Sequence, residues 1–356
     1  MPPDDVADLL VADLLVIDLL GGIGDLVMLL PSLRGLARRH PGAAVRVLTH
    51  APGATLLDPD PDVAEVRAVR KGTERAAVVA ELERRPPDLV VSTTRYDGIA
   101  EEIERRVPRS VTDLWRRPPP DEPVARRYHR ILTAEGLVRG RYAPPRLHLT
   151  AQERSAGRHL LASLLPAGDA GGASTRDGPQ PGGAGPQPGA VGGPQSRRGA
   201  APVVLVPDAG MAVKRWPHQD RLAAELTRRG VPVLVLGRDV PPTSLRELAA
   251  LFAAVGRRGG VVVGADTGPV RVAAAAGART VGLFGPTVAA RYGLDPPSVD
   301  LQGLPGCPHR RPTAITEQVC WWDAACPLAG HGPACMADLT PTAVLTTVLD
   351  ALGGPP

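Results

Sequence analysis

The sequence alternates short runs of Val, Leu and Ile with stretches of helical periodicity, and it does so twice, on either side of a segment rich in Gly and Pro. The first series predicts strands over 14–20, 44–50 and 88–93, and helices starting at 24 and spanning 76–85, 122–137 and 151–165. The second predicts strands within 203–206, 232–237, 260–268 and 280–286, and helices over 219–229, 244–257, 269–276 and 341–352. Such alternation indicates βαβ units with parallel strands, so we expect an α/β protein with two sheets.

The Gly- and Pro-rich segment 166–202 marks the boundary between the two series. It contains the near-repeats PQPGGAG and PQPGAVG and hardly any large apolar side chain, so it cannot offset the entropy of becoming ordered. We therefore expect an N-terminal domain (1–165), a disordered linker (166–202) and a C-terminal domain (203–339). We expect a last helix (340–356), and leave open that it packs back on the N-terminal domain.

Composition narrows the classes of function. The formal charge of +4 comes from basic and acidic residues that are interleaved along the chain, without the basic stripe of a nucleic-acid-binding protein. Residues 1–20 lack the basic start of a signal peptide, and no apolar run approaches the roughly 18 residues of a membrane-spanning helix. We expect a soluble, cytoplasmic protein, with peripheral membrane contact left open.

The first predicted strand leads into the loop 21–25, GGIGD, at a position where open parallel sheets bind ligands. Asp25 is either a group that acts on a bound hydroxyl or a first-turn acid favoured by the helix dipole. A nicotinamide-type dinucleotide site fits poorly, because Val27 stands at the third glycine position. The second strand also ends at Thr49 and His50, without the acid that would hold a ribose.

Two loops of the second series have features of phosphate sites. Lys214 is one of two lysines in a chain that otherwise uses arginine, and it is either a phosphate ligand or a solvated loop residue. In the other loop, Asp266 or Thr267 can cap a helix that has Pro269 in its first turn, and the free amides near Gly268 suit an anion. That pattern also fits a helix start without a ligand, but two phosphate-competent loops in one domain favour a bound anion.

Taken in order, these motifs resemble glycosyltransferase family 9, the heptosyltransferase family. The family pattern begins with G-x-x-G-D and a Leu-rich helix ending in P-x-L-R-x-L, and residues 21–36 of this chain are similar to it. Its next part is P-G-A-x(4)-K-R-W-P, to which residues 207–217 are similar. It continues as D-T-G-P-x(2)-L-A-A-A-x-G and F-G-P-T at 266–287. The resemblance covers nearly the whole chain outside the linker.

The resemblance implies a GT-B fold, in which two Rossmann-like domains face a cleft. It implies an inverting, metal-independent glycosyltransferase that holds the acceptor mainly on the N-terminal domain and a nucleotide-sugar on the C-terminal one. Heptose is the default sugar of the family, ADP is a candidate nucleotide, and no separate cofactor is expected. The acceptor would be a glycan, a lipid-linked glycan or a small glycoside. The implied roles are general base for Asp25, phosphate contact for Lys214, sugar and diphosphate contacts for Asp266, Thr267 and Gly268, and ribose contact for Asp239.

The chain departs from the family pattern at several positions. Asp208 stands at the glycine of P-G-A, Arg271 and Val272 replace the usual His and Leu after D-T-G-P, and Leu19 or Leu20 stands where a basic residue is common. These changes bear on the donor more than on the fold. Two alternatives to transfer therefore stay open: a catalytically degenerate nucleotide-sugar-binding protein, and a GT-B nucleotide-sugar epimerase or hydrolase.

The four cysteines invite a zinc interpretation. Cys307, Cys320, Cys326 and Cys335 have the spacing C-x(12)-C-x(5)-C-x(8)-C, without the C-x-x-C pair typical of structural zinc sites. We expect reduced cysteines that pack in the interior, and no metal site.

Overall fold

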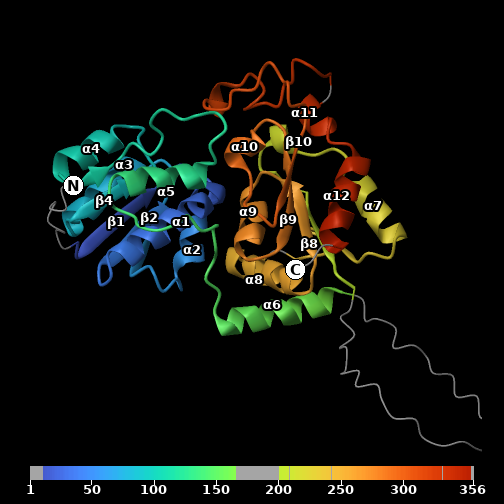
Figure 1. Ribbon diagram of the computed structural model, residues 1–356, viewed down its shortest axis with the longest axis horizontal. Coiled ribbons are helices and arrows are strands. Elements are labelled where there is room, and N and C mark those ends of the chain that lie inside the picture. Colours follow the sequence, from blue (N-terminus) through green and yellow to red (C-terminus); the bar gives the residue numbers. More distant parts are fainter. Residues whose placement is uncertain (1–10, 166–199, 208, 242, 331, 354–356) are drawn as a thin grey trace, which may run out of the picture.

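The computed structural model describes residues 11–165 and 200–353, apart from 208, 242 and 331. The chain forms two α/β domains that lie side by side (Figure 1), each built on a sheet of five parallel strands. The predicted α/β class with two sheets is confirmed. The linker prediction falls almost entirely outside the described residues, as does the departure from the family pattern at position 208.

The N-terminal sheet has the strand order β3-β2-β1-β4-β5. Its central strand is buried along its whole length because its sequence, DLLVID, is almost continuously apolar, as is typical of a strand covered by helices on both faces. The strands are β1 (Asp13–Asp18), β2 (Ala44–His50), β3 (Glu65–Val69), β4 (Leu89–Ser92) and β5 (Ser110–Val111). The helices are α1 (Ile23–Arg39), α2 (Ala51–Leu57), α3 (Glu74–Arg84), α4 (Ile99–Arg106) and α5 (Val124–Ala134).

The C-terminal sheet has the order β10-β9-β8-β6-β7. Its strands are β6 (Val203–Val206), β7 (Val233–Val235), β8 (Val261–Ala265), β9 (Arg279–Phe284) and β10 (Val299–Gln302). Its helices are α7 (Gln219–Arg228), α8 (Leu245–Arg257), α9 (Gly268–Ala275), α10 (Ala289–Tyr292), α11 (Ala334–Ala337) and α12 (Pro341–Gly353), with 3₁₀ turns η1 (Ala212–Lys214) and η2 (Ile315–Glu317). Pro269 stands in the first turn of α9, where its missing N–H costs nothing.

The packing of two helices bears on the predicted domain boundaries. Helix α6 (Ala151–Leu164), which the sequence assigns to the N-terminal domain, packs along α8 of the C-terminal domain (Figure 1). Glu153 of α6 forms an ion pair with Arg246 of α8 at 2.5 Å. The last helix, α12, packs on α7, β8 and β9, where Val344, Leu345 and Val348 enter the core of its own domain. The main contacts of α12 are therefore with its own domain rather than with the N-terminal domain.

One apolar core runs from the first domain into the second. Leu29 and Leu33 of α1 belong to the same buried cluster as Val272 of α9 and Phe252 of α8. Because buried apolar contact is the main source of stability in such an interface, the two domains are held in a defined relative position. Any site between α1 and α9 is therefore built on packed elements.

Candidate active site

The candidate residues follow the strands at which each sheet reverses its order. In the N-terminal sheet, β1 and β4 are neighbours although β2 follows β1 in the chain, and in the C-terminal sheet β8 lies beside β6. Ligands of open α/β sheets bind beyond the carboxyl ends of such strands. Asp25 follows β1, Lys214 follows β6, and Asp266 follows β8 directly. The fold thus places all three at the two switch points.

Two glycines bring these switch points against each other. Helix α1 contacts α9 across the domain boundary. A Cβ atom added to Gly268 would lie 3.0 Å from Cβ of Ile23, and one added to Gly24 would lie 2.9 Å from Cδ of Arg271. The N-terminal turns of the two helices therefore approach each other closely only because both positions lack a side chain.

A charge cluster lies at the start of α9. The ammonium of Lys214 donates to the Asp266 carbonyl at 2.8 Å and to its Oδ2 at 3.2 Å, while Nη2 of Arg271 donates to Oδ1 at 2.6 Å. Burial alone would raise the pKa of Asp266, but Arg271 and Lys214 outweigh it and hold the pKa at about 2. The cluster therefore contains one ionised carboxylate and two cations.

The side chain of Thr267 bears on whether the start of α9 is a ligand site or only a helix start. It is the N-cap residue of α9, yet its side chain makes no capping hydrogen bond. Among the residues that the structure describes, its buried hydroxyl has no hydrogen-bond partner. Because an unpaired buried hydroxyl is unfavourable, this group is available to donate to an anion bound next to the Gly268 amide, and an anion contact at Thr267 and Gly268 stays a prediction.

Asp25 faces this cluster from the other domain. It is the third residue of α1 and is half-buried. Burial is the largest influence on its carboxyl and raises its pKa; Arg271 and Lys214 act in the opposite direction, and Asp266 adds to the rise. The net result is a raised pKa, as a proton acceptor working near neutral pH requires.

The sequence did not single out Asp18, although an acid at the end of an otherwise apolar strand is a signal. Asp18 is 2% exposed and accepts a hydrogen bond of 2.6 Å from the Thr93 hydroxyl. Burial, and after it the charge of Asp25, raises the pKa of Asp18 to about 7. Arg271 was noted only as a departure from the family pattern, and it lies at the centre of the charge cluster.

Asp239 lies apart from the charge cluster. It follows β7, the edge strand of the C-terminal sheet, and its Oδ2 accepts the Val235 amide at 2.8 Å. The same carboxylate pairs with Arg238 at 3.0 Å. The carboxylate thus holds its own turn together, and a ribose contact at Asp239 stays a prediction.

A cavity of about 340 Å³, here called the acceptor-side cavity after the role that the resemblance implies for this domain, opens on the N-terminal domain. It is bounded by the ends of three neighbouring strands and the loops after them: β1 supplies Asp18 and Gly22, β2 supplies His50, and Arg70 and Lys71 follow β3. Its wall combines a carboxyl, an imidazole and two cations. Such a wall suits a polar ligand with hydroxyl or acidic groups.

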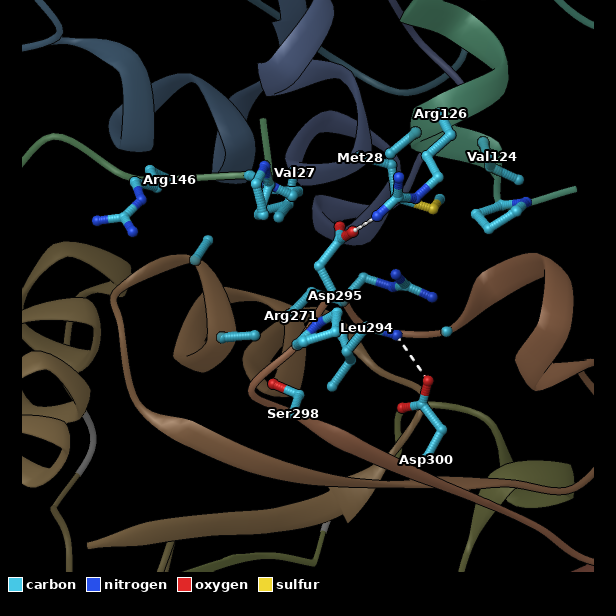
Figure 2. Close-up of a pocket in the computed structure, with 18 of the residues that line it drawn as sticks. Val27, Met28, Val124, Arg126, Arg146, Arg271, Leu294, Asp295, Ser298 and Asp300 are labelled. Atoms are coloured by element: carbon cyan, nitrogen blue, oxygen red, sulfur yellow. Dashed lines mark hydrogen bonds and ion pairs between the residues drawn. The ribbon is translucent and has the colours of Figure 1, made fainter. Parts of the chain in front are cut away.

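A larger cavity of about 600 Å³ lies between the domains (Figure 2). Val27 and Met28 of α1 form one wall and Arg271 of α9 another. Arg126 reaches across from α5 to Asp295 of the C-terminal domain, with Nη2 2.8 Å from Oδ1, as Figure 2 shows. The cavity shares Arg271 with the charge cluster.

All four cysteines line one small cavity and none forms a disulfide. Burial raises the pKa of the Cys335 thiol to about 11 and also raises that of Cys320. In the described part of the chain, no three His, Cys, Asp or Glu side chains are grouped as a metal would require. The same segment places the Trp321 ring 5.4 Å from the Lys214 ammonium.

Residues 239–304 match the model of glycosyltransferase family 9 (heptosyltransferase). The fold is similar to that of the family 9 glycosyl transferase from Veillonella parvula, with a TM-score of 0.68, 15% identity, and 96% of this chain and 97% of that one covered. It is also similar to E. coli ADP-heptose lps heptosyltransferase II (TM-score 0.60, 18% identity, 96% and 98% covered). A third similar structure is E. coli heptosyltransferase WaaC with ADP (TM-score 0.60, 14% identity, 95% and 99% covered).

No curated protein sequence matches the chain. The family match and the structural similarity confirm both the GT-B fold and the resemblance to family 9 that the motifs predict. Among the helices that the structure describes, none has the length and apolar character needed to cross a bilayer.

Proposed function

We propose that this chain is a glycosyltransferase that moves a sugar from a nucleotide-sugar to an acceptor hydroxyl at the junction of α1 and α9. The observation that carries the proposal is the position of Asp25, whose carboxyl on one domain is acted on by Lys214, Arg271 and Asp266 of the other. A proton acceptor facing a cationic site is what sugar transfer requires. The match to family 9 and the fold of the heptosyltransferases support the same reaction.

On the donor side, the diphosphate would lie at the start of α9. Lys214 and Arg271 supply positive charge, and the free Thr267 hydroxyl and the Gly268 amide supply hydrogen bonds. These groups stabilise the charge that develops on the leaving diphosphate, and they do so within a preorganised site. Because protein cations serve this purpose, we propose transfer without a metal ion.

On the acceptor side, Asp25 removes the hydroxyl proton as the acceptor oxygen bonds to the anomeric carbon and the bond to the diphosphate breaks. One displacement of this kind inverts the configuration at the anomeric carbon. The cavity beside Asp18 and Lys71 would hold the acceptor, a glycan, a lipid-linked glycan or a small glycoside.

The donor is the least specified part of the proposal. An ADP-linked heptose is the first candidate. The similar structure of WaaC is one with ADP, and the similar heptosyltransferase II is named for ADP-heptose. We further propose that the protein works in the cytoplasm, where the four thiols would stay reduced, with peripheral membrane contact if the acceptor is lipid-linked.

Product analysis with a panel of labelled nucleotide-sugars and acceptor fractions tests the proposal. We expect label on an acceptor, with inverted anomeric configuration. Tight binding without turnover would favour a degenerate binding protein. Release of free sugar or an epimerised nucleotide-sugar, independent of any acceptor, would favour a hydrolase or epimerase.

A further inference from the structure

The cavity between the domains is separate from the groups proposed for sugar transfer. Its volume of about 600 Å³ lies within the range of about 300–1,000 Å³ that small-molecule sites occupy. Neither Asp25 nor Lys214 is among the residues that line it, and it shares no lining residue with the acceptor-side cavity. A molecule bound in this cavity would therefore occupy a site of its own.

Both domains build the wall of this cavity (Figure 2). Val27 and Met28 come from α1 and Val124 and Arg126 from α5, while the C-terminal domain contributes parts of 271–278 and 289–300. The connection between the domains adds residues 144–147. Because segments far apart in the sequence meet here, the cavity exists only when the domains pack together. A ligand inside it would stabilise that arrangement.

Much of the wall is apolar. Val27, Met28 and Val124 are buried and line the cavity from the N-terminal domain. Opposite them, α9 presents the small side chains of Ala274 and Ala275, which leave open the space that larger residues would fill. An apolar molecule would lose its contact with water here, which favours binding.

Four arginines line the cavity, and carboxylates neutralise two of them. Arg126 pairs with Asp295 at 2.8 Å, and Arg271 pairs with Asp266 at 2.6 Å. The Tyr142 hydroxyl also donates to Asp295 at 2.7 Å, so both oxygens of that carboxylate have a partner. Asp295 therefore adds no uncompensated negative charge to the wall.

The other two arginines, Arg146 and Arg291, have no carboxylate partner among the described residues. Arg291 is 1% exposed, and its Nη1 donates at 2.8 Å to a neutral group, the Pro119 carbonyl. Its Nη2 has no hydrogen-bond partner in the same part of the chain. The Arg146 side chain is exposed and makes no hydrogen bond or ion pair with a described residue. A buried guanidinium without a counter-ion is costly, and an anion bound nearby would reduce that cost.

One acid of the wall, Asp300, also lacks an ion-pair partner among the described residues. Its Oδ2 accepts the Leu294 amide at 2.8 Å, as Figure 2 shows. Burial raises the pKa of Asp300 to about 7, so this carboxyl is partly protonated at neutral pH. The wall therefore carries an excess of positive charge.

We propose that the cavity between the domains binds an amphipathic anion, with an apolar body against α1 and α9 and a carboxylate or phosphate group attracted by Arg146 and Arg291. This site does not depend on the proposed sugar transfer. Because Arg271 belongs both to the cavity wall and to the charge cluster, an occupant is coupled to the donor side.

Methionine-methyl NMR tests the site with sodium octanoate as the probe. The chain has four methionines, and among Met28, Met211 and Met336 only Met28 lines the cavity. We expect octanoate to shift the Met28 methyl signal saturably while the signals of Met211 and Met336 stay in place. Octanol has the same body without the charge and should bind more weakly. No shift of Met28 below the micelle concentration of octanoate, or an equal response to octanol, would overturn the proposal.

A space-filling variant locates the bound probe. Ala290→Phe places a ring in the cavity from an exposed position of α10, so it should weaken octanoate binding without unfolding the protein. Ala51→Phe is the matched control, because it places the same ring in the acceptor-side cavity and should leave octanoate affinity unchanged. Equal affinities in wild type and a folded Ala290→Phe protein would place the probe elsewhere and refute the site.

A charge variant tests the anionic part and does not depend on the space-filling change. Arg146→Gln should weaken octanoate binding about 2–5-fold, the range expected for one exposed charge. Arg139→Gln removes an exposed arginine of the same connection that does not line the cavity, so its octanoate affinity should match the wild type. The same affinity in both variants would show that the wall does not select an anion.

Geranyl phosphate distinguishes two sources of such a ligand, a free acyl carboxylate and the lipid phosphate of a lipid-linked molecule. With the same Met28 response, tighter binding of geranyl phosphate than of octanoate would assign the cavity to a lipid phosphate, and the reverse order to an acyl carboxylate. Failure of both to shift Met28 would refute the site. These titrations need no sugar donor, so their result stands whether or not the chain transfers sugar.

Discussion

At the scale of single residues, the site is defined by an unequal division of charge. Lys214 and Arg271 lie on the C-terminal domain around Asp266, whereas Asp25 lies on the N-terminal domain with a raised pKa. A cationic site favours a leaving diphosphate, and a carboxyl of raised pKa favours proton removal. The two functions that the proposed transfer requires therefore fall on opposite sides of one junction.

Lys214→Ala should weaken donor binding. Loss of a charged hydrogen bond to the diphosphate is worth about 1.5–3 kcal/mol, which predicts a dissociation constant roughly 10–100-fold higher for the nucleotide-sugar. Calorimetry with the nucleotide-sugar that the wild type binds measures the change. Lys71→Ala is the control, because it removes the other lysine, which lines the acceptor-side cavity. Equal donor affinity in wild type and Lys214→Ala would refute the phosphate contact.

Several of these residues could be predicted from sequence because they stand in motifs with a local physical reason. Asp25 follows a glycine loop at a strand end, and Asp266, Thr267 and Gly268 form a helix start. Asp18 lies outside such motifs, and Arg271 stands in one only as a departure from the family pattern, so only the burial of β1 and the approach of α9 to α1 show their importance. The contact between Lys214 and Asp266 joins residues 52 positions apart, so spacing in the sequence could not reveal it.

At the scale of elements, long and strongly periodic segments were predictable and short ones were not. The predicted helices over 151–165 and 244–257 correspond to α6 and α8, whose starts carry complete capping boxes. Helices α2 and α4 and strand β3 were not predicted, because they span only a few residues and β3 is partly exposed and charged. The packing of α6 on the C-terminal domain depends on contacts across the chain, which local patterns do not record.

Gly24→Ala should impair activity while leaving the protein folded. The new methyl would lie 2.9 Å from Cδ of Arg271, a side chain already held by Asp266 and by the Tyr292 carbonyl. The methyl therefore displaces either Arg271 or the start of α1. We expect a clear loss of turnover with little change in melting temperature, measured beside Gly306→Ala, where a Cβ atom meets nothing within 4 Å. Full activity in Gly24→Ala would show that the close approach is dispensable.

Gly157→Ala should instead destabilise the protein. A Cβ atom at this position of α6 would lie 2.2 Å from the Ala250 carbonyl oxygen of α8, so the two helices must separate. Overpacking of this kind typically costs about 1–3 kcal/mol, more than the gain in helix propensity. Denaturant unfolding measures the free energy, with the exposed Ser163→Ala on the same helix as control. Unchanged or increased stability would mean that α6 does not pack on α8 as described.

At the scale of the whole molecule, the buried acids of the junction tie stability to pH. The pKa of Asp18 rises from 3.8 to about 7 on folding, so the folded state holds its proton where the unfolded chain has lost it. The resulting loss of unfolding free energy is absent below about pH 4, grows between about pH 4 and 7 and is complete above pH 7. Asp18 therefore destabilises the folded state at neutral pH.

Asp18→Asn should therefore gain stability relative to the wild type as the pH rises. A pKa change of this size corresponds to roughly 4 kcal/mol at most, all of it expressed by about pH 8 and none below about pH 4. Urea unfolding of both proteins at several pH values measures the difference. A difference in unfolding free energy that does not vary with pH would contradict the raised pKa of Asp18.

The most direct test of the account is the turnover of Asp25→Asn with the donor at saturation. The change keeps size and polarity but removes proton acceptance at the acceptor hydroxyl, so turnover should fall by roughly 10²–10⁴-fold while the dissociation constant of the donor stays unchanged. If Asp25 served only the helix dipole, the change would cost at most about 1 kcal/mol of stability and leave the rate intact. Near-normal turnover in a folded Asp25→Asn protein would contradict the assignment of Asp25 as the base.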